Sequence, residues 1–304
     1  MKPKIILVIG PTAVGKSKMA LGLAQEIGAE IINADSQQVY RYMDIGTEKP
    51  SEAERELVRH HIIDVANPDQ EFNVAMFCRL AEESIRDIES RGRNVIVCGG
   101  TGLYIKALTR GLFVGPAHDS LIRARLKEEL ETHGLGALYH RLVGVDLAAT
   151  SRIHPNDQQR IMRALEVYEL TGKPMSEWQE AHGFGERPYE TLTVALDRER
   201  AELYDRINQR CEKMIEAGLL DEVAGLVKKG YGLDLRPLKS VGYRHMGLVL
   251  KGEMLLDEAV ELMKRDTRRL AKRQLTWFRG VDEIHWYHPN DKAQIDSSVE
   301  RFLR

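Results

Sequence analysis

The fold of this chain follows from one octapeptide, Gly10-Pro11-Thr12-Ala13-Val14-Gly15-Lys16-Ser17. It comes after a continuous apolar run at residues 5–9 and opens a helical pattern. A strand, a glycine-rich turn and a helix in this order are typical of a phosphate-binding P-loop. The glycines let backbone N–H groups point inward, Lys16 adds a cation, and the helix aims its positive dipole end at the same point. The motif predicts a diphosphate or triphosphate site, with the Ser17 hydroxyl as a candidate Mg²⁺ ligand.

Short apolar segments alternate with helical periodicity on both sides of this octapeptide. Because they are short, apolar and contain β-branched residues, we predict buried strands at 4–9, 30–34, 94–98 and 191–196. Between the second and third of these strands, apolar residues recur at helical spacing over 74–91. The alternation predicts an α/β fold, with a P-loop NTPase-like parallel sheet flanked by helices.

The pattern changes in the middle of the chain. Residues 120–181 show helical periodicity without a convincing strand. We therefore predict a helical insertion domain at 116–190, placed between two parts of the core at 1–115 and 191–304. The remaining predicted elements are long helices at 201–229 and 254–279 and short strands at 60–65 and 282–287.

Composition excludes several classes of protein. Hydrophobic residues make up 43% and charged residues 30% of the 304 residues, which is ordinary for a globular protein with a real core. The net charge of −2 does not by itself demand a nucleic acid partner. The 3 cysteines have neither the number nor the spacing of a disulfide framework or a zinc site. With no signal peptide or membrane-spanning run in the sequence, we expect a cytoplasmic monomer without a membrane partner.

Asp35 comes directly after the predicted strand 30–34. Ligands of open parallel sheets bind at the carboxyl ends of the strands, so Asp35 should share a crevice with Lys16. A carboxylate in that position can hold a metal ion, act as a base on a nucleophile beside the phosphates, or cap a turn. The glycine-rich turn after strand 94–98 should face the same crevice, but it supplies no acid of the kind that nucleotide-hydrolysing P-loop enzymes use for Mg²⁺.

Basic residues cluster near the end of the chain. Helix 264–279 carries seven basic residues against one acid, Asp266. Such a local excess is typical of an RNA-binding surface, but it also fits a solvated amphipathic helix. For the arginines of the insertion, three roles remain open at this point: they could close over phosphates, bind an RNA backbone, or face solvent.

Seven motifs carry a resemblance to a known family: GPTAVGKS at 10–17, ADSQQVY at 34–40, GGTGLY at 99–104, QQRIMRALEVYELTGKP at 158–174, ERAELYDRINQR at 199–210, KSVGYRH at 239–245 and KRQLTWFR at 272–279. They run in order over nearly the whole chain. In this combination the chain resembles the bacterial tRNA dimethylallyltransferases. The P-loop alone would be weak evidence, but its pairing with Asp-Ser-x-Gln-x-Tyr and Gly-Gly-Thr-Gly-Leu-Tyr is highly specific.

The resemblance implies transfer of a dimethylallyl group from dimethylallyl diphosphate. The acceptor would be the exocyclic amine of the adenine just 3′ of the anticodon, in tRNAs that read codons beginning with U. The octapeptide from Gly10 to Ser17 would then hold the donor diphosphate together with Mg²⁺, and this role fits the missing acid after residue 98. Asp35 would be the general base, and Thr101 would assist at the same centre.

The resemblance also implies which residues meet the tRNA anticodon stem-loop. The flipped adenine would contact Asp35, Ser36, Gln37, Gln38 and Thr101. The insertion would contact the tRNA through Arg123, Gln159, Arg160, Ile161, Met162 and Arg163. Arg200 and Arg244 match recurrent arginines of the family and are candidates for binding diphosphate or RNA phosphate.

Three rival functions stay open at this point. A nucleoside or nucleotide kinase would use Asp35 as the base on a hydroxyl, and an adenylate isopentenyltransferase would use the same donor with a free nucleotide. A P-loop RNA-binding switch would perform no transfer at all. An insertion of roughly seventy residues, longer than an ordinary loop, favours a macromolecular acceptor. Asp35 and Thr101 beside the P-loop argue against a switch.

Overall fold

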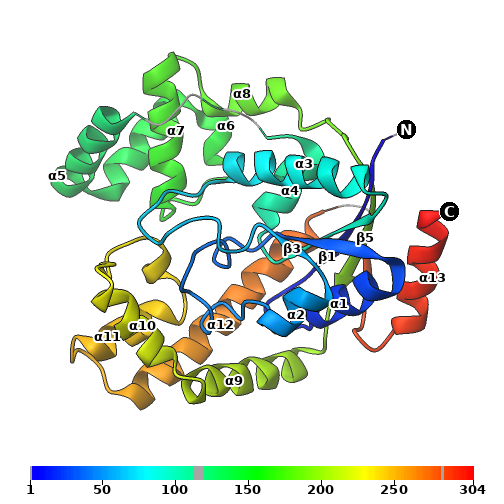
Figure 1. Ribbon diagram of the computed structural model, residues 1–304. Coiled ribbons are helices and arrows are strands. Elements are labelled where there is room, and N and C mark those ends of the chain that lie inside the picture. The colour runs from blue at the N-terminus through cyan, green and yellow to red at the C-terminus, as the bar shows by residue number, and fades with distance from the viewer. Residues whose placement is uncertain (1, 113–114, 116–118, 282–283) are drawn as a thin grey trace. The chain divides into compact units, whose positions relative to one another are not determined.

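The computed structural model describes residues 2–112, 115, 119–281 and 284–304 (Figure 1). The chain divides into two compact units. The core unit combines Met1–Thr109 with Pro188–Arg304, and the helical unit is Arg110–Arg187. The insertion that we predicted at 116–190 corresponds to this second unit, which begins six residues earlier and ends three residues earlier.

A parallel sheet lies at the centre of the core unit. Within the described residues it has six strands in the order β3-β2-β4-β1-β5-β6, and every neighbouring pair is parallel. The strands are β1 Lys4–Ile9, β2 Ala29–Asn33, β3 His60–His61, β4 Asn94–Gly99, β5 Glu190–Leu196 and β6 His285–Tyr287. β1 is central and buried, and it pairs with a strand from each half of the chain. The predicted fold class is confirmed.

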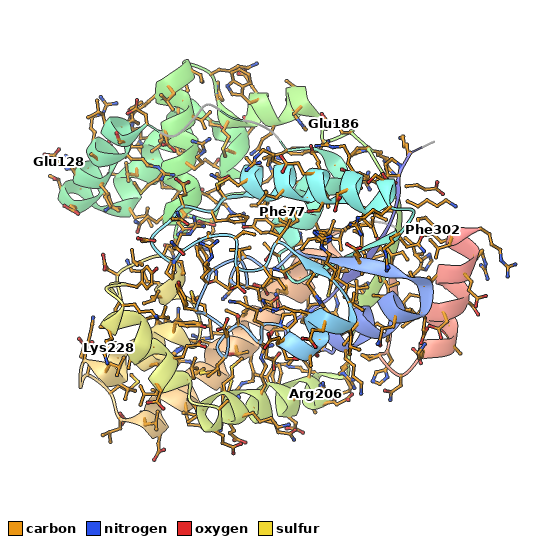
Figure 2. The ribbon with its side chains drawn as sticks, viewed as in Figure 1. Phe77, Glu128, Glu186, Arg206, Lys228 and Phe302 are labelled. Atoms are coloured by element: carbon orange, nitrogen blue, oxygen red, sulfur yellow. The ribbon has the colours of Figure 1, made fainter. Side chains whose placement is uncertain are left out.

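Helices cover both faces of this sheet. Figure 1 shows α1, Lys16–Ile27, on the opposite face of the sheet from α3, Val74–Ser90. α3 carries Phe77 (Figure 2), whose ring stacks on Tyr104 at a centroid distance of 4.3 Å. Tyr104 belongs to α4, Gly102–Arg110, the helix that begins at the glycine-rich turn after β4. The connections between strands therefore bury their apolar faces against the sheet and leave its carboxyl edge for ligands.

The C-terminal half adds further helices to the core unit. Their bounds are α9 Arg200–Glu216, α10 Leu219–Lys228, α11 Tyr243–Leu250, α12 Leu256–Arg279 and α13 Lys292–Leu303, with a 3₁₀ turn at Pro237–Lys239. The first part of the chain contributes one more short helix, α2 Glu52–Leu57. α9 and α11 both pack against α12, and α13 lies beside β5. No helix in the described ranges is both long and apolar enough to cross a membrane.

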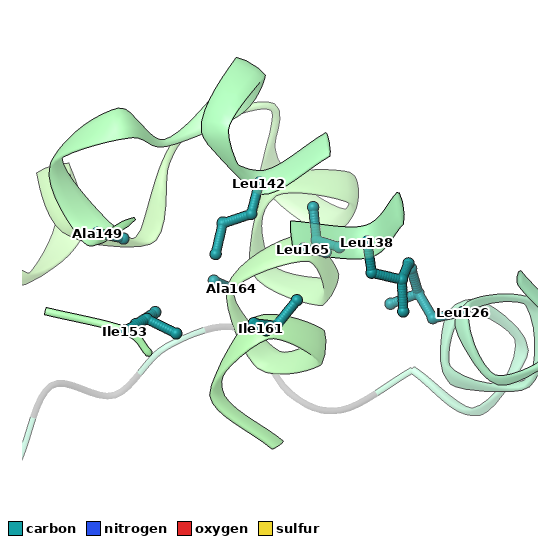
Figure 3. Close-up of a cluster of buried hydrophobic side chains, with 8 residues drawn as sticks. All are labelled: Leu126, Leu138, Leu142, Ala149, Ile153, Ile161, Ala164 and Leu165. Atoms are coloured by element: carbon teal, nitrogen blue, oxygen red, sulfur yellow. The ribbon is translucent and has the colours of Figure 1, made fainter. Parts of the chain in front are cut away.

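The helical unit has its own apolar core. Its helices are α5 Ser120–Val145, α6 Leu147–Thr150, α7 Gln158–Thr171 and α8 Met175–His182. The chain leaves helical geometry within α5 at Gly134, where φ is 76°. Figure 3 shows side chains of α5, α6 and α7 and of the α6–α7 connection converging on one cluster: Leu126, Leu138, Leu142, Ala149, Ile153, Ile161, Ala164 and Leu165.

Two sequence-based predictions of elements need correction. The helix predicted at 201–229 is two helices, because the first ends at Glu216 and Gly218, with φ 94°, precedes the second. The strand predicted at 60–65 has only two residues, since Ile62 and Asp64 adopt positive φ angles of 61° and 58°. The strand predicted at 282–287 is present from His285, while 282 and 283 lie outside the described residues.

A buried charge network joins β2 and the edge strand β3 to Arg91, at the C-terminal end of α3. Glu30 of β2 is 3% exposed and accepts hydrogen bonds from Arg91 and from His61 of β3, the latter at 2.7 Å. The hydrogen bonds from Arg91, with that from His61, hold the pKa of Glu30 at about 2, well below its ordinary value. A carboxyl with a depressed pKa stabilises the folded state above its unfolded pKa, and this contribution is lost as the pH falls toward about 2.

We predict that Glu30→Gln lowers the free energy of unfolding at neutral pH by about 2 kcal/mol, because a neutral amide replaces the buried carboxylate that pairs with Arg91 and His61. The difference between the variant and the parent protein should shrink as the pH falls below about 4.5, where the unfolded carboxyl becomes protonated. Urea unfolding at neutral and acidic pH measures both values. A difference that stays constant with pH would contradict the assignment.

Candidate active site

The P-loop is built as the octapeptide predicts. It connects β1 to α1, and the backbone reverses at Gly10, Ala13 and Gly15, whose φ angles are 142°, 63° and 111°. Gly10 also lies so close to β5 that a Cβ there would come within 2.5 Å of the Leu196 carbonyl oxygen. These turns direct the loop amides toward the N-terminus of α1, which is a ready site for phosphate groups.

Arginines from the second half of the chain hold the outer side of this loop. Arg198 donates from Nε to the Val14 carbonyl at 2.9 Å, and Arg206 of α9 donates from Nε to the Ala13 carbonyl at 2.9 Å. One turn further along α9, Arg210 donates to the Thr12 hydroxyl. The C=O and N–H of one peptide unit point in opposite directions. A carbonyl that is bound on the outer side of the loop therefore turns its N–H toward the inner side, and these contacts preorganise the loop for an anion.

Gln274 of α12 connects the two glycine-rich turns. Its Oε1 accepts from the Thr12 N–H at 2.8 Å, and its Nε2 donates to the Gly100 carbonyl at 3.0 Å. The turn after β4 fits tightly on this side. A Cβ on Gly100 would lie 2.4 Å from Gln274 Nε2, and a Cβ on Gly102 would lie 2.2 Å from the Trp277 ring. The second glycine-rich turn is therefore a wall that packs against α12.

Backbone neighbours of Asp35, at the end of β2, form hydrogen bonds with Thr101, at the end of β4. The Thr101 N–H donates to the Ala34 carbonyl at 3.2 Å, and the Ser36 N–H donates to the Thr101 hydroxyl at 3.1 Å. Asp35 Oδ1 accepts from the Gln37 N–H at 2.8 Å. One carboxylate oxygen thus fixes the turn while the group remains partly exposed, so the second oxygen is available to a ligand.

Cavities of the core unit bring the predicted residues together. Asp35, Lys16, Ser17 and Cys98 line a small cavity of about 70 Å³. It shares Thr12, Asp35, Thr47, Arg210 and Gln274 with a larger cavity of about 450 Å³, which we call the acceptor cavity. On its other side it shares residues of the P-loop and Arg210 with an outer cavity of about 420 Å³. The predicted meeting of Asp35 and Lys16 in one crevice is confirmed.

The electrostatics of this crevice favour an anion beside a base. Lys16 donates from Nζ to the Pro11 carbonyl at 2.7 Å. Burial lowers the pKa of the Lys16 ammonium, and the nearby Cys98 and Asp35 oppose that shift. The Cys98 thiol itself is buried, which raises its pKa to about 11, so it stays protonated at neutral pH. The charged groups that line the small cavity are therefore the cations Lys16 and Arg210 and the carboxylates Asp35 and Glu48, and Arg210 pairs with Glu48 at 3.2 Å.

The segment from Asp44 to Gly46 is held by one carboxylate. Glu222 of α10 accepts from the backbone N–H groups of Asp44, Ile45 and Gly46 at 3.0, 2.7 and 3.3 Å. The Tyr243 hydroxyl donates to the same carboxylate at 2.6 Å. Gly46 has no room for a side chain, because a Cβ would lie 2.4 Å from the Tyr243 ring. Since Gly46 and Thr47 line the acceptor cavity, Glu222 shapes its wall.

Residues predicted to meet adenine differ in how they are used. Gln38 donates from Nε2 to the Thr47 and Glu48 carbonyls, both at 3.0 Å, so its amide supports the wall. Ser36 and Gln37 line the acceptor cavity. Gln37 Oε1 is buried and has no hydrogen-bond partner among the described residues. An unpartnered acceptor at this position suits the exocyclic amine of a base.

The two predicted family arginines lie in different places. Arg244 lines the acceptor cavity and donates to Asp266, which also pairs with Arg265 and Arg269. Arg200 is exposed at the first turn of α9, with its guanidinium 5.1 Å from the Tyr204 ring, and it lines none of the three cavities. Arg206 and Arg210 contact the P-loop from α9, and a contact of Arg200 with diphosphate or RNA phosphate stays a prediction.

In the helical unit, the buried carboxylate of Glu166 forms ion pairs with two arginines that we predicted to contact tRNA. Glu166 is 1% exposed and pairs with Arg123 at 3.1 Å and with Arg163 at 2.8 Å. Gln159 and Arg160 are exposed at the start of α7, and Met162 is partly buried. Ile161 needs correction as a contact, because its side chain is fully buried in the cluster of Figure 3. It supports the helix from which its neighbours project.

Ser17 is exposed at the first turn of α1, next to Lys16. Within the described residues there is no group of three or more His, Cys, Asp or Glu side chains that could hold a metal ion. A single hydroxyl oxygen beside a P-loop suits Mg²⁺, because this ion keeps several waters and binds through one or two protein oxygens together with substrate phosphates. Ser17 is the residue that would supply such an oxygen.

Comparisons with known proteins point to one family. The family described as IPP transferase matches residues 38–281. A tRNA dimethylallyltransferase of Syntrophobacter fumaroxidans is 51% identical over 99% of this chain and 87% of its own length. The tRNA dimethylallyltransferase 2 of Syntrophus aciditrophicus is 50% identical over 100% of this chain and 97% of its own.

The chain belongs to the IPP transferase family.

Solved structures support the same assignment. The full-length tRNA isopentenylpyrophosphate transferase of Bacillus halodurans is 37% identical, with a TM-score of 0.72 over 100% of this chain and 98% of that one. A eukaryotic dimethylallyltransferase, described as acting on tRNA, has a TM-score of 0.78 at 29% identity over 98% of this chain and 77% of that one. As an IPP transferase, the chain is an enzyme that transfers a prenyl group.

Several residues of this IPP transferase site were not found by reasoning from sequence. They are Arg198, Arg206, Arg210, Gln274, Glu222 and Tyr243. The spacing of Arg206 and Arg210, four residues apart on one helix face, was a usable signal. Glu222 and Tyr243 left no local signal, because each acts on a segment far away in sequence.

We predict that Glu222→Gln lowers the free energy of unfolding by about 2 kcal/mol, since an amide replaces the carboxylate that accepts from three backbone N–H groups. Tyr243→Phe removes a single hydrogen bond to that carboxylate and should cost about 1 kcal/mol. Urea unfolding of both variants provides the comparison. Equal losses in the two variants would mean that the backbone contacts of Glu222 contribute nothing.

Proposed function

We propose that this enzyme transfers a dimethylallyl group from dimethylallyl diphosphate to the exocyclic amine of the adenine 3′-adjacent to the anticodon in tRNAs reading codons that begin with U. The observation that carries the proposal is that Asp35 and the P-loop Lys16 line one cavity. Family membership supports a prenyl diphosphate as the donor in place of ATP. The product would be isopentenyladenosine in the anticodon stem-loop.

The P-loop would bind the donor and stabilise its departing diphosphate. The loop amides, the N-terminus of α1 and the Lys16 ammonium all direct positive charge to the same point. Arg210 lines the small cavity and the acceptor cavity, so its guanidinium is placed to follow the charge that develops on the leaving group. When bound with the diphosphate, Mg²⁺ would neutralise part of this charge, with Ser17 as its protein ligand.

Asp35 would take the proton of the attacking amine. An adenine amine is a weak nucleophile because its lone pair is delocalised into the ring, so a carboxylate that accepts its proton during attack lowers the barrier. Oδ1 is engaged by the Gln37 N–H, which leaves Oδ2 as the basic atom. Thr101 positions this turn through its hydrogen bond with Ser36. The carbon–nitrogen bond forms as the carbon–oxygen bond to diphosphate breaks.

The adenine has to leave the stack of the anticodon arm to reach Asp35. The acceptor cavity, with Ser36 and Gln37 on its wall, has polar groups for the edge of the base. In the helical unit, Arg123, Arg163, Gln159 and Arg160 would contact the RNA backbone. Glu166 holds the first two as a fixed pair of guanidinium groups, and such rigid forks suit phosphate oxygens.

The direct test is incubation of the purified enzyme with labelled dimethylallyl diphosphate, Mg²⁺ and an unmodified anticodon stem-loop, beside AMP and ATP controls. Label in the RNA is the expected result. Label in AMP instead would move the acceptor to a free nucleotide, and consumption of ATP without prenyl transfer would identify a kinase. Binding of the stem-loop without any transfer would leave only an RNA-binding role.

We predict that Asp35→Asn lowers kcat for prenyl transfer by about a hundredfold or more, because the amide keeps the acceptor for the Gln37 N–H but cannot take a proton. The Kd for the stem-loop should change little. Asp35→Ala is the matched control, since it removes the turn bond as well. If Asp35→Asn were nearly as active as the parent enzyme, Asp35 would not be the base.

We also predict that Lys16→Ala raises KM for dimethylallyl diphosphate by about tenfold to a hundredfold, because a buried ammonium beside the diphosphate is lost. RNA affinity should be unaffected. Steady-state kinetics with either substrate varied, together with stem-loop binding in the absence of donor, separates the two effects. A variant that loses RNA affinity and keeps its donor KM would place the diphosphate elsewhere.

A further inference from the structure

Tyr42 has an unusual backbone conformation for a large side chain. Its φ angle is 67°, in the left-handed region that bulky residues seldom adopt. The backbone on both sides fixes this conformation. The Arg41 N–H donates to the Ala66 carbonyl at 2.9 Å, and Met43 is fully buried. The Met43 carbonyl also accepts from the Thr47 hydroxyl at 2.6 Å.

The strained position presents an aromatic ring to solvent. Tyr42 is 45% exposed. Tyr231 lies beside it, with ring centroids 6.3 Å apart and an angle of 31° between the rings. The Lys229 ammonium lies 4.9 Å from the centre of the Tyr42 ring. We call Tyr42, Tyr231 and Lys229 the tyrosine platform.

The partner ring is held as firmly as Tyr42. α10 ends at Lys228, and Gly230 then adopts φ 94°. The N–H of Tyr231 donates back to the Leu226 carbonyl at 3.1 Å, which closes the helix end. Both rings therefore extend from fixed backbone, and little conformational entropy remains to be lost when a ligand stacks on them.

The same two segments continue into the acceptor cavity. Gly46 and Thr47 follow Tyr42, and residues 239–241 follow Tyr231; all of them line that cavity. The four peptide units between Tyr42 and Gly46 span at most about 15 Å. A few nucleotides of single-stranded RNA can cover this distance, so a strand whose adenine enters the cavity would carry a neighbouring base to the platform.

We propose that the tyrosine platform stacks an unpaired base of the RNA acceptor, adjacent to the adenine that enters the acceptor cavity. Exposed aromatic rings next to cations are the usual means of binding unstacked bases, because every base offers a π face and each phosphate a negative charge. Arg41 adds a second cation to the neighbourhood, against the acid Asp69, and both interact electrostatically with Tyr231. The inference rests on the proposed function, since it takes the acceptor to be RNA.

The left-handed backbone makes Tyr42→Gly an informative variant. Glycine adopts this conformation freely, so the variant should fold with an unchanged or higher Tm. It also removes the ring, so its Kd for the stem-loop should rise by about tenfold. Tyr42→Phe keeps the ring in the same backbone and should bind like the parent enzyme. Tyr42→Asn tolerates the backbone without a ring and should behave like Tyr42→Gly.

The measurement is the Kd of a labelled anticodon stem-loop by fluorescence anisotropy, in the absence of the prenyl donor. Three RNAs are compared: the intact stem-loop, one with an abasic nucleotide on the 5′ side of the target adenine, and one with an abasic nucleotide on its 3′ side. The effect of Tyr42→Gly should vanish with one of the abasic RNAs. Equal affinities of the parent enzyme and Tyr42→Gly for intact RNA would overturn the proposal. A loss that persists with both abasic RNAs would also overturn it, because the ring would then act on something other than a neighbouring base.

Prenyl transfer by the parent enzyme to the intact stem-loop is measured in parallel. If transfer occurs and Tyr42→Gly binds normally, only the platform is excluded. If the parent enzyme prenylates AMP and does not bind the stem-loop, the acceptor is a free nucleotide. The proposed function and the base-stacking role of the platform are then both wrong.

Discussion

The active site depends on hydrogen bonds that draw the P-loop carbonyls outward. The loop itself can turn because Gly10 and Gly15 accept positive φ angles, but turning does not fix where its N–H groups point. Arg198 and Arg206 bind the carbonyls of Val14 and Ala13. Gln274 has a different role, because it accepts from the N–H of Thr12 and so fixes the loop through an amide that is not offered to an anion. Anion binding by backbone amides requires this kind of preorganisation, because water would otherwise compete for each amide.

The same contacts explain why the two glycine-rich turns form one wall. Gln274 uses both ends of its amide, one on each turn. Gly99, Gly100 and Gly102 let the second turn approach Ala34 and α12 without a side chain between them. Thr101 lies between these glycines, and its hydroxyl is therefore carried to the Asp35 turn. The Asp35 carboxylate and the P-loop thus lie together, although the two glycine-rich turns and Asp35 follow three different strands, β1, β4 and β2.

Patterns that are local in sequence could be predicted. The central strands, the P-loop and the placement of Asp35 near Lys16 follow from apolar runs, from glycines and from the rule for parallel sheets. The break at Gly218 could not, since a glycine inside a helical pattern is often tolerated. Ile161 was grouped with its neighbours in one motif, although the turn of α7 directs its side chain into the core. Arg210 and Glu222 contact residues that are 198 and 177 positions away, and no local pattern reports such pairs.

The order of these segments along the chain has a consequence for synthesis on the ribosome. The P-loop emerges among the first residues, but its partner Gln274 is 262 residues later, and β5, which pairs with the central strand β1, follows the whole helical unit. Contacts of such long separation form late. A nascent chain therefore carries the P-loop sequence long before it carries the partners that hold the loop, and this wall of the cavity cannot form until Gln274 has been synthesised.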